Sequence, residues 1–429
     1  MIYRDILDAI RPWLQTDKII IIKGARQVGK TTILTYLKNE LEASGRQVRY
    51  IAADLDFADP SFGDPRLFIL RLDDLFGGKP GTILIDEFQT IPQSGLFLKT
   101  VHDQTKDRYR FLVSGSSTLE LTRNAEFLTG RKKEFTVGPF SFREFVRARY
   151  PGVPLRSLDP SDNAALADFA SLYGSTLKTA YSEYLSLGGY PEPVLSPPEL
   201  RLEILKELLS TYIRKDVAGY LRIDNVSGFN NLVRLLGSQI GSQVNKSELA
   251  STLRLNSETV YRYLDILEGT FMYRLVPPWF TNPRKETSKM PKVYVTDFGI
   301  LIASGAGMVA NVPYDLLDGH RVENAVWSSL GKTFGTERIK YWRTSSGAEV
   351  DFIIETDSGL APVEVKFSTA SPSEPVAMRN FRAQYKEARP GLIVSRDTIG
   401  DSPAQGSGRP MIVPAYLVDF LDFGLWKRE

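Results

Sequence analysis

The sequence contains no cysteine and only two histidines, His102 and His320. The absence of cysteine excludes disulfide bonds, thiolate zinc sites and cysteine nucleophiles. With so few histidines, any catalytic metal must depend on carboxylate ligands, which favours Mg²⁺ or Mn²⁺. No apolar run reaches the roughly twenty residues that span a membrane, so we expect no membrane contact. The first residues, Met1–Ile6, lack the apolar region of a signal peptide, and we therefore expect a cytoplasmic protein.

Strong net charge is also lacking, because 53 Lys and Arg nearly balance 51 Asp and Glu. A formal net charge of +2 gives no bulk field for nucleic acid, so any DNA contact must come from local basic patches. The 429 residues are enough for about two to four domains with a sizeable core.

A glycine-rich segment, Lys23–Thr32, lies between the apolar run Ile19–Ile22 and a helical pattern. It fits G-x-x-x-x-G-K-[ST], in which backbone N–H groups and a helix N-terminus surround phosphates. Lys30 would reach the β- and γ-phosphates, and the Thr31 hydroxyl would bind Mg²⁺. We predict an ATP site formed by Gly24, Ala25, Arg26, Gln27, Val28, Gly29, Lys30, Thr31 and Thr32.

An acidic pair follows a second apolar strand, Gly81–Ile85. Such a run suits the interior of a parallel sheet, and it places Asp86 at the strand's carboxyl end, where open α/β sheets bind ligands. Asp86 would hold the Mg²⁺ shell, and Glu87 would polarise the attacking water. The pair predicts ATP hydrolysis in addition to binding.

Hydroxyl groups end a third strand, Arg110–Ser117. Ser114 and Ser116 are candidate γ-phosphate sensors, although Ser-Gly-Ser is equally ordinary turn chemistry. The basic turn Leu128–Lys133 offers Arg131 as an arginine finger that would stabilise charge on the transferring phosphoryl group. Arg123 is the alternative finger, and either arginine could simply be solvated.

Strand and helix signals alternate up to about residue 150, as expected for a doubly wound parallel sheet. Two Pro-rich interruptions, Pro151–Pro154 and Asp159–Asp162, then suggest a boundary. From Asn163 to Leu221 the pattern is mainly helical, with a stop signal at Leu187–Pro191. We predict an α/β P-loop core over 1–150 and a helical lid or linker over 151–225.

A helix, a three-residue turn and a second helix occupy Lys246–Glu268, followed by a strand at Phe271–Val276. This order predicts a winged helix-turn-helix over 226–285, whose second helix enters a DNA groove. A protein-contact role stays open, because Glu258 would repel phosphate. The candidate DNA contacts are Arg254, Tyr261, Arg262, Arg284, Lys285 and Lys289.

Two alternating strands in the C-terminal segment, 286–429, carry acids and a lysine. The first puts Glu349 and Asp351 on one face with Val350 and Phe352 on the other, and the second puts Glu364 and Lys366 together. Converging carboxylates can bind divalent ions that activate water for phosphodiester cleavage, with lysine orienting the water. The alternative is a sheet with solvated acids. The predicted site comprises the metal ligands Glu323, Asp351 and Glu364 and the catalytic residues Asp351, Glu364 and Lys366.

Together these patterns resemble prokaryotic P-loop ATPases of the AAA superfamily that carry a C-terminal domain of unknown function. The stretches KGARQVGKTT, ILIDEFQTIP, LVSGSSTLEL, LTGRKKEF, PFSFREF, LGGYPEPV and YWRTSSGAEVDFII…PVEVKFS occur in that family's order over nearly the whole chain. The resemblance implies ATP chemistry at Lys30, Thr31, Asp86 and Glu87, and a sensor position at Ser114 to Ser116. It also implies a restriction-endonuclease-like α/β C-terminal domain of PD-(D/E)XK type, with Val350 in place of the motif's proline. Members usually form rings, often hexamers.

The leading hypothesis is therefore an ATP-driven DNA motor with a Mg²⁺- or Mn²⁺-dependent nuclease domain that acts on duplex or branched DNA. The alternative is an ATP-dependent regulator that binds DNA or a partner protein and cuts nothing.

Overall fold

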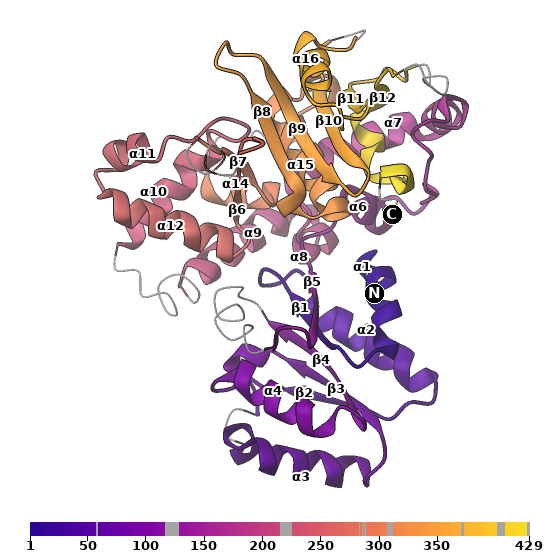
Figure 1. The fold of residues 1–429 in the computed structure, drawn as a ribbon, viewed down its shortest axis with the longest axis vertical. Coiled ribbons are helices and arrows are strands. Elements are labelled where there is room, and N and C mark those ends of the chain that lie inside the picture. Colours follow the sequence, from indigo (N-terminus) through magenta and orange to yellow (C-terminus); the bar gives the residue numbers. More distant parts are fainter. Residues whose placement is uncertain are drawn as a thin grey trace. The chain divides into compact units, whose positions relative to one another are not determined.

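The computed structural model describes residues 1–56, 59–115, 128–214, 225–282, 284, 286, 289–306, 312–369, 373–400 and 408–426 (Figure 1). The chain divides into two compact units. Unit 1 comprises Met1–Pro139 and Asp265–Met272, and unit 2 comprises Phe140–Leu264 and Tyr273–Glu429. The division into four segments made from the sequence stays a prediction.

Unit 1 contains a five-stranded parallel sheet in the order β2-β3-β4-β1-β5, which confirms the expected α/β core. Because parallel strands share their carboxyl edge, this order places the end of β4 between the glycine-rich loop after β1 and the acidic pair after β3. The strands are β1 (Ile19–Lys23), β2 (Val48–Ala52), β3 (Gly81–Asp86), β4 (Tyr109–Gly115) and β5 (Lys132–Thr136). The helices are α1 (Ile6–Ile10), α2 (Lys30–Ala43), α3 (Pro65–Phe76) and α4 (Ser94–Thr105).

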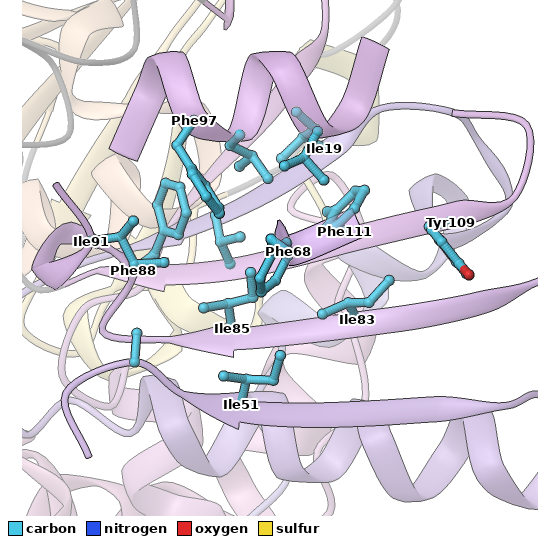
Figure 2. Close-up of a cluster of buried hydrophobic side chains, with 14 of the residues drawn as sticks. Ile19, Ile51, Phe68, Ile83, Ile85, Phe88, Ile91, Phe97, Tyr109 and Phe111 are labelled. Atoms are coloured by element: carbon cyan, nitrogen blue, oxygen red, sulfur yellow. The ribbon is translucent and has the colours of Figure 1, made fainter. Parts of the chain in front are cut away.

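One face of this sheet supports a large apolar core (Figure 2). Alternate strand residues, such as Ile83 and Ile85, point to it and meet Phe68 of α3 and Phe97 of α4. Residues of the other parity, such as Leu84, are also fully buried, and α2 packs against β2, β3 and β4. Burying each large apolar side chain contributes about 1.5–3 kcal/mol, so the carboxyl edge that carries the predicted ATP-site residues rests on a well-packed core.

Unit 2 begins with helices, as the sequence predicted for the segment after residue 150. The long helix α7 begins after Asp162, whose carboxylate accepts the N–H of Ala165, and ends at Gly188. A lid role for this region stays a prediction. The helices that begin in unit 2 are α6 (Phe142–Arg149), α7 (Asn163–Leu187), α8 (Pro191–Leu195), α9 (Pro198–Tyr212), α10 (Val226–Gly237), α11 (Lys246–Leu253), α12 (Ser257–Gly269), α14 (Phe298–Ser304), α15 (Gly319–Phe334) and α16 (Val376–Gln384). The last residues of α12, from Asp265, belong to unit 1.

The Gly-Gly stop after α7 is explained by a buried carboxylate. Asp297 accepts the N–H of Gly189 at 2.6 Å with one oxygen and, with the other, caps α14 through the N–H of Gly299 at 2.8 Å. A Cβ on Gly188 would lie 2.1 Å from the Asp297 carboxylate, so glycine is required there. Burial raises the pKa of Asp297 to about 6, although both N–H donors oppose that rise.

A two-stranded antiparallel sheet follows α10, α11 and α12. Its strands are β6 (Tyr273–Val276) and β7 (Lys292–Val295), so the expected strand near residue 273 is present. After β6, the backbone N–H of Trp279 donates to the carbonyl of Tyr341 in β8. The chain therefore contacts the C-terminal sheet directly after β6. Three helices and a two-stranded sheet are the elements of a winged helix, but that assignment stays a prediction.

The C-terminal part of unit 2 has a separate mixed sheet in the order β12-β11-β10-β9-β8, with α15 and α16 packed against it (Figure 1). A register shift between Lys340 and Trp342 leaves both Asp351 and Phe352 opposite Tyr341, which is a β-bulge. The expectation that Val350 and Phe352 share a face is therefore wrong. Val350 packs in a core with α16, while the Phe352 ring lies 5.7 Å from that of Tyr294. The strands are β8 (Ile339–Arg343), β9 (Glu349–Thr356), β10 (Gly359–Lys366), β11 (Leu392–Ser395) and β12 (Met411–Pro414).

No helix in the described part of the chain is both long and apolar enough to cross a membrane.

Candidate functional site

The glycine-rich loop has the backbone conformation that its residue types permit. Gly29 adopts a φ of 94° immediately before α2, and Gln27 a φ of 59°. A Cβ on Gly24 would lie 2.0 Å from the carbonyl oxygen of Val137, so no larger residue fits. The Lys30 ammonium donates to the carbonyl oxygens of Gly24 at 3.0 Å and Ala25 at 2.8 Å. The loop therefore encloses a positive charge at a helix N-terminus, which suits phosphate.

Asp86 is the centre of a hydrogen-bond network at the carboxyl edge of the sheet. Its Oδ2 accepts the hydroxyls of Thr31 at 2.5 Å and Tyr50 at 2.8 Å. Its Oδ1 accepts the hydroxyl of Ser114 and, at 3.1 Å, the N–H of Glu87. The structure thus brings together Thr31, Asp86 and Ser114 as the sequence predicted. Thr31 and Asp86 present the oxygen donors that Mg²⁺ prefers, so these residues fit the ion.

Glu87 lies directly after Asp86 with a left-handed backbone, φ 50°. Its backbone N–H donates both to Asp86 Oδ1 and to the Ser114 hydroxyl oxygen, the latter at 3.2 Å. The side-chain amide of Gln89 donates to Glu87 Oε2. The left-handed backbone and these neighbours restrict the orientation of Glu87, whose role as a general base stays a prediction.

Sequence reasoning missed two residues of this site, Tyr50 and Arg4. Tyr50 comes from β2, and burial together with its bond to Asp86 raises the pKa of its hydroxyl. The buried Arg4 guanidinium donates from Nη1 to the Val28 carbonyl and from Nη2 to the Gly138 carbonyl, both at 2.7 Å. Neither residue belongs to a sequence motif, and only the fold brings them to the loop.

Arg131 lies at the opposite edge of the sheet from the glycine-rich loop. It immediately precedes β5, whose first residue is in register with Ile19 at the start of β1, and its guanidinium pairs with Asp103 at 2.6 Å. The loop begins at the far end of β1, roughly 15 Å away at about 3.3 Å per residue. Arg131 could therefore act only on the nucleotide of a neighbouring chain. Ser116 and the alternative finger Arg123 lie outside the described residues.

The predicted DNA contacts of α11 and α12 are exposed. Arg254, Tyr261 and Arg262 all face solvent, and the Lys246 ammonium lies 4.9 Å from the centre of the Tyr261 ring. Arg254 adopts a left-handed φ of 53° as the C-cap of α11. Arg284 and Lys289 are exposed beyond β6, and Lys285 lies outside the described residues. DNA contact by these residues stays a prediction.

The predicted C-terminal acids do converge. Asp351 on β9 and Glu364 on β10 are joined by the Asp351 N–H, which donates to Glu364 Oε2 at 3.2 Å. The Lys366 ammonium donates to Glu364 Oε1 at 2.5 Å, so the lysine and acid of the E-x-K pattern do share a face. Glu323 of α15 belongs to the same group, because one ammonium, that of Lys292, lies within 3.6 Å of both Glu323 and Asp351.

Lys292 is the member of this cluster that sequence reasoning missed. Its ammonium lies 3.0 Å from Glu323 Oε1, 2.6 Å from Glu349 Oε1 and 3.6 Å from Asp351 Oδ1, and its side chain is 3% exposed. The Tyr294 hydroxyl also donates to Glu323, at 2.6 Å. The alternation of β7, which puts Lys292 and Tyr294 on one face, is the signal that could have found them.

The pKa values of this cluster follow from burial and charge. Burial opposes the charge of Lys292, but the surrounding carboxylates outweigh it and raise its pKa. Burial, reinforced by neighbouring carboxylates, raises the pKa of Asp351, and burial raises that of Glu364. Burial would also raise the pKa of Glu323, but its His320 and Lys292 partners prevail and lower it.

This arrangement does not fit a divalent ion. Within the described ranges, no group of three or more His, Cys, Asp or Glu side chains is placed to hold a metal. The metal role predicted for Glu323, Asp351 and Glu364 therefore has no support from their geometry, and no chemical step through a metal follows from it.

Three segments match known protein-family models. Residues 16–146 match a family described as an AAA domain. Residues 178–308 and 318–410 match two families described as domains of unknown function (DUF8612 and DUF4143). The AAA match agrees with the loop, the acidic pair and the parallel sheet. The N-terminal unit contains a P-loop ATPase domain.

The chain is also similar to whole proteins. An uncharacterized protein of Mycobacterium tuberculosis is 25% identical over 398 residues, which cover 91% of this chain and 79% of that protein. An uncharacterized protein of Haemophilus influenzae is 22% identical over 366 residues, covering 82% and 83%. A solved structure of AMPPCP-bound DnaA from Aquifex aeolicus covers 61% of this chain and 86% of its own, at 14% identity and a TM-score of 0.28. A TM-score this low supports no argument about function.

Proposed function

We propose that this protein is an ATP-hydrolysing P-loop ATPase that uses ATP turnover to act on DNA. The observation that carries the ATPase role is the Asp86 network, which fixes the Thr31 hydroxyl, the Asp86 carboxylate and the adjacent Glu87 at one edge of the sheet. Hydrolysis needs an acid beside the ligands of the ion to activate water, whereas a loop that only bound nucleotide would not need one.

Each residue of the site has a separable role in this proposal. The loop N–H groups and Lys30 hold the phosphates, Thr31 and Asp86 hold Mg²⁺, and Glu87 accepts the proton of the attacking water. When bound, Mg²⁺ neutralises charge on the phosphate oxygens. Ser114 positions Glu87 and Asp86, since its hydroxyl contacts both.

The test of hydrolysis separates binding from chemistry. Lys30→Ala should abolish ATP binding, while Glu87→Gln should leave ATP bound and lower phosphate release by at least about a hundredfold. Glu183→Gln is the matched control, because this carboxylate lies on α7 and pairs with Arg149 and Arg201. Normal turnover by Glu87→Gln would remove Glu87 from the mechanism.

Support for DNA as the substrate comes from the exposed basic residues of α11 and α12. If Arg254 and Arg262 contact phosphates, replacing both with alanine should weaken DNA binding and reduce the salt slope by about 2. Arg338→Ala is the control, since Arg338 is also exposed, lies outside α11 and α12, and pairs with Asp357 at 2.8 Å. DNA binding without salt dependence, or none at all, would favour a protein partner for this region.

The C-terminal unit has two candidate functions. The first is the metal-dependent cleavage predicted for Asp351, Glu364 and Lys366, on duplex or branched DNA. The second is a non-cleaving regulatory role, and the contacts of Lys292 with the carboxylates favour it. Incubating wild type and Lys366→Ala with plasmid and junction DNA in Mg²⁺, Mn²⁺ or EDTA separates them, because only cleavage that is lost in Lys366→Ala and in EDTA supports the first.

Ring formation is part of the proposal, since Arg131 is too far from its own loop to serve it. Light scattering measures the number of chains in the assembly. The sample is the full-length Glu87→Gln variant with ATP, and a hexamer is the expected state. A monomer with full ATPase activity would refute a finger supplied by a neighbour.

A further inference from the structure

We propose that Lys292 is a built-in cation of the C-terminal carboxylate cluster, taking the place that a divalent ion would otherwise occupy. The cluster consists of Glu323, Glu349, Asp351 and Glu364. This inference deepens the proposed non-cleaving role of the C-terminal unit. Its test measures cation binding rather than cleavage, so either proposal can fail without the other.

The first argument is the position of the ammonium. Three carboxylates from two elements, α15 and β9, surround it within 3.6 Å. An ammonium carries three N–H donors and one positive charge, so it can satisfy several acceptors at once, as an ion would. A buried position with this many acids is unstable without a cation at its centre.

The second argument is that the carboxylate oxygens already have partners. Glu323 Oε1 accepts from Lys292 and Tyr294, and its Oε2 lies 3.8 Å from His320 Nδ1. Glu349 Oε1 faces Lys292 at 2.6 Å, and its Oε2 faces Arg343 at 3.0 Å.

The remaining two acids are engaged in the same way. Asp351 Oδ1 lies 3.6 Å from the Lys292 ammonium, and its Oδ2 accepts the N–H of Val365 at 2.9 Å. Glu364 receives Lys366 on one oxygen and the Asp351 N–H on the other. Every oxygen of the cluster thus has a donor or cation beside it, so a divalent ion would have to compete with these partners, and with the ammonium charge of Lys292, for the same carboxylates.

The third argument is that the backbone of Lys292 is anchored. Lys292 pairs with Val276 in the two-stranded sheet, and on its other side it bridges to Gln243. The neighbouring Val293 N–H and C=O bond to Ser242 and Gly241. The backbone of Lys292 therefore cannot shift without disrupting β7, and its side chain is buried in the cluster at 3% exposure, whereas Lys366 is 37% exposed at the end of its strand. The ammonium also ties the β6–β7 sheet to β9 and α15.

The test compares Lys292→Met with Lys340→Met in the full chain, each carrying Thr31→Ala and Asp86→Asn to remove the ATP-site ion ligands. Lys340 is a suitable control because it also lies between two carboxylates, Glu286 at 2.8 Å and Glu355 at 2.9 Å. Mn²⁺ binding is measured from the electron paramagnetic resonance of free Mn²⁺, and Tm is measured in Mn²⁺ and in EDTA.

We expect the Thr31→Ala, Asp86→Asn parent to bind no Mn²⁺ and to have the same Tm in Mn²⁺ and EDTA. Lys292→Met should lose roughly 10 °C of Tm in EDTA, bind about one Mn²⁺ and regain much of the loss in Mn²⁺. Lys340→Met should lose Tm without regaining it.

Two outcomes would overturn the proposal. One is Mn²⁺ binding by the parent that disappears on adding Asp351→Asn, which shows a divalent site beside an intact Lys292. The other is a Lys292→Met protein that neither loses Tm nor takes up Mn²⁺. If Lys292→Met folds in Mn²⁺ but not in EDTA, the proposal is supported. If Lys292→Met folds in neither condition, the Mn²⁺ titration of the parent, with and without Asp351→Asn, decides. Binding that is lost with Asp351→Asn overturns the proposal, and no binding by the parent supports it.

Discussion

Replacing Arg4 with alanine should loosen the ATP-binding loop more than any other change outside the loop itself. The Arg4 guanidinium makes two hydrogen bonds of 2.7 Å, a buried one to Val28 in the loop and a partly buried one to Gly138 beyond β5. Each hydrogen bond from a charged donor contributes about 1.5–3 kcal/mol, so losing both should cost about 3 kcal/mol or more locally. Because Val28 directly precedes Gly29, the loop would open before the sheet does.

Hydrogen exchange followed by mass spectrometry on peptides covering 19–34 measures this opening. A cost of about 3 kcal/mol corresponds to roughly hundredfold faster exchange, and ATP affinity should fall in parallel. Arg4→Lys should lie between wild type and alanine, since an ammonium cannot bridge both carbonyls as a guanidinium does.

Arg11→Ala provides the control. Arg11 binds Glu40 and Asp8 on the surface of the same unit, with its side chain 34% exposed. Exposed ion pairs contribute about 0–1 kcal/mol, so exchange near the loop should change by less than about fivefold. If Arg4→Ala exchanges no faster than Arg11→Ala, the inference that Arg4 fixes the loop is wrong.

Three further predictions concern single residues. Gly24→Ala should abolish ATP binding in a calorimetric titration, because its Cβ would lie 2.0 Å from the Val137 carbonyl, whereas Gly63→Ala, with open space around its Cβ, should bind normally. Ser114→Ala should lower kcat about tenfold with little change in KM, since it removes the hydroxyl that donates to the Asp86 carboxylate and accepts the Glu87 N–H; Ser114→Thr should recover part of the loss, and a change in KM alone would contradict this. Asp297 has a folded pKa of about 6 against an ordinary 3.8, so the folded chain holds this proton more tightly and stability falls by about 3 kcal/mol as pH rises through that interval. Tm should therefore fall more between pH 4.5 and about 7 in wild type than in Asp297→Asn, and equal slopes would refute the assignment.

The β-bulge in β9 shows why strict alternation did not predict the faces of this strand correctly along its whole length. Strict alternation correctly puts Glu349 and Asp351 on one face, because both approach Lys292. One extra residue in β9 then moves Phe352 away from the face of Val350. Nothing in the run E-V-D-F-I-I marks the bulge, because it depends on pairing with β8.

The sequence by itself determined the ATP-binding loop and the acidic pair, because each consists of neighbouring residues whose geometry follows from strand, turn and helix. The positions of Gly24 and Lys30 after β1, and of Asp86 and Glu87 at the carboxyl end of β3, could be predicted in this way, and their roles stay predictions. It also determined that Glu364 and Lys366 share a face, since a strand alternates with a period of two.

Only the tertiary structure decided which distant residues complete these sites. Arg4 lies 134 residues from Gly138, and Lys292 lies 31 residues from Glu323, so no local period relates them. The path of the chain and the pairing of its strands bring these residues together in space. Once they are buried, they form hydrogen bonds and ion pairs, because a charge removed from water is costly without a partner. That requirement is why Lys292, ordinary in sequence, sits at the centre of the C-terminal cluster.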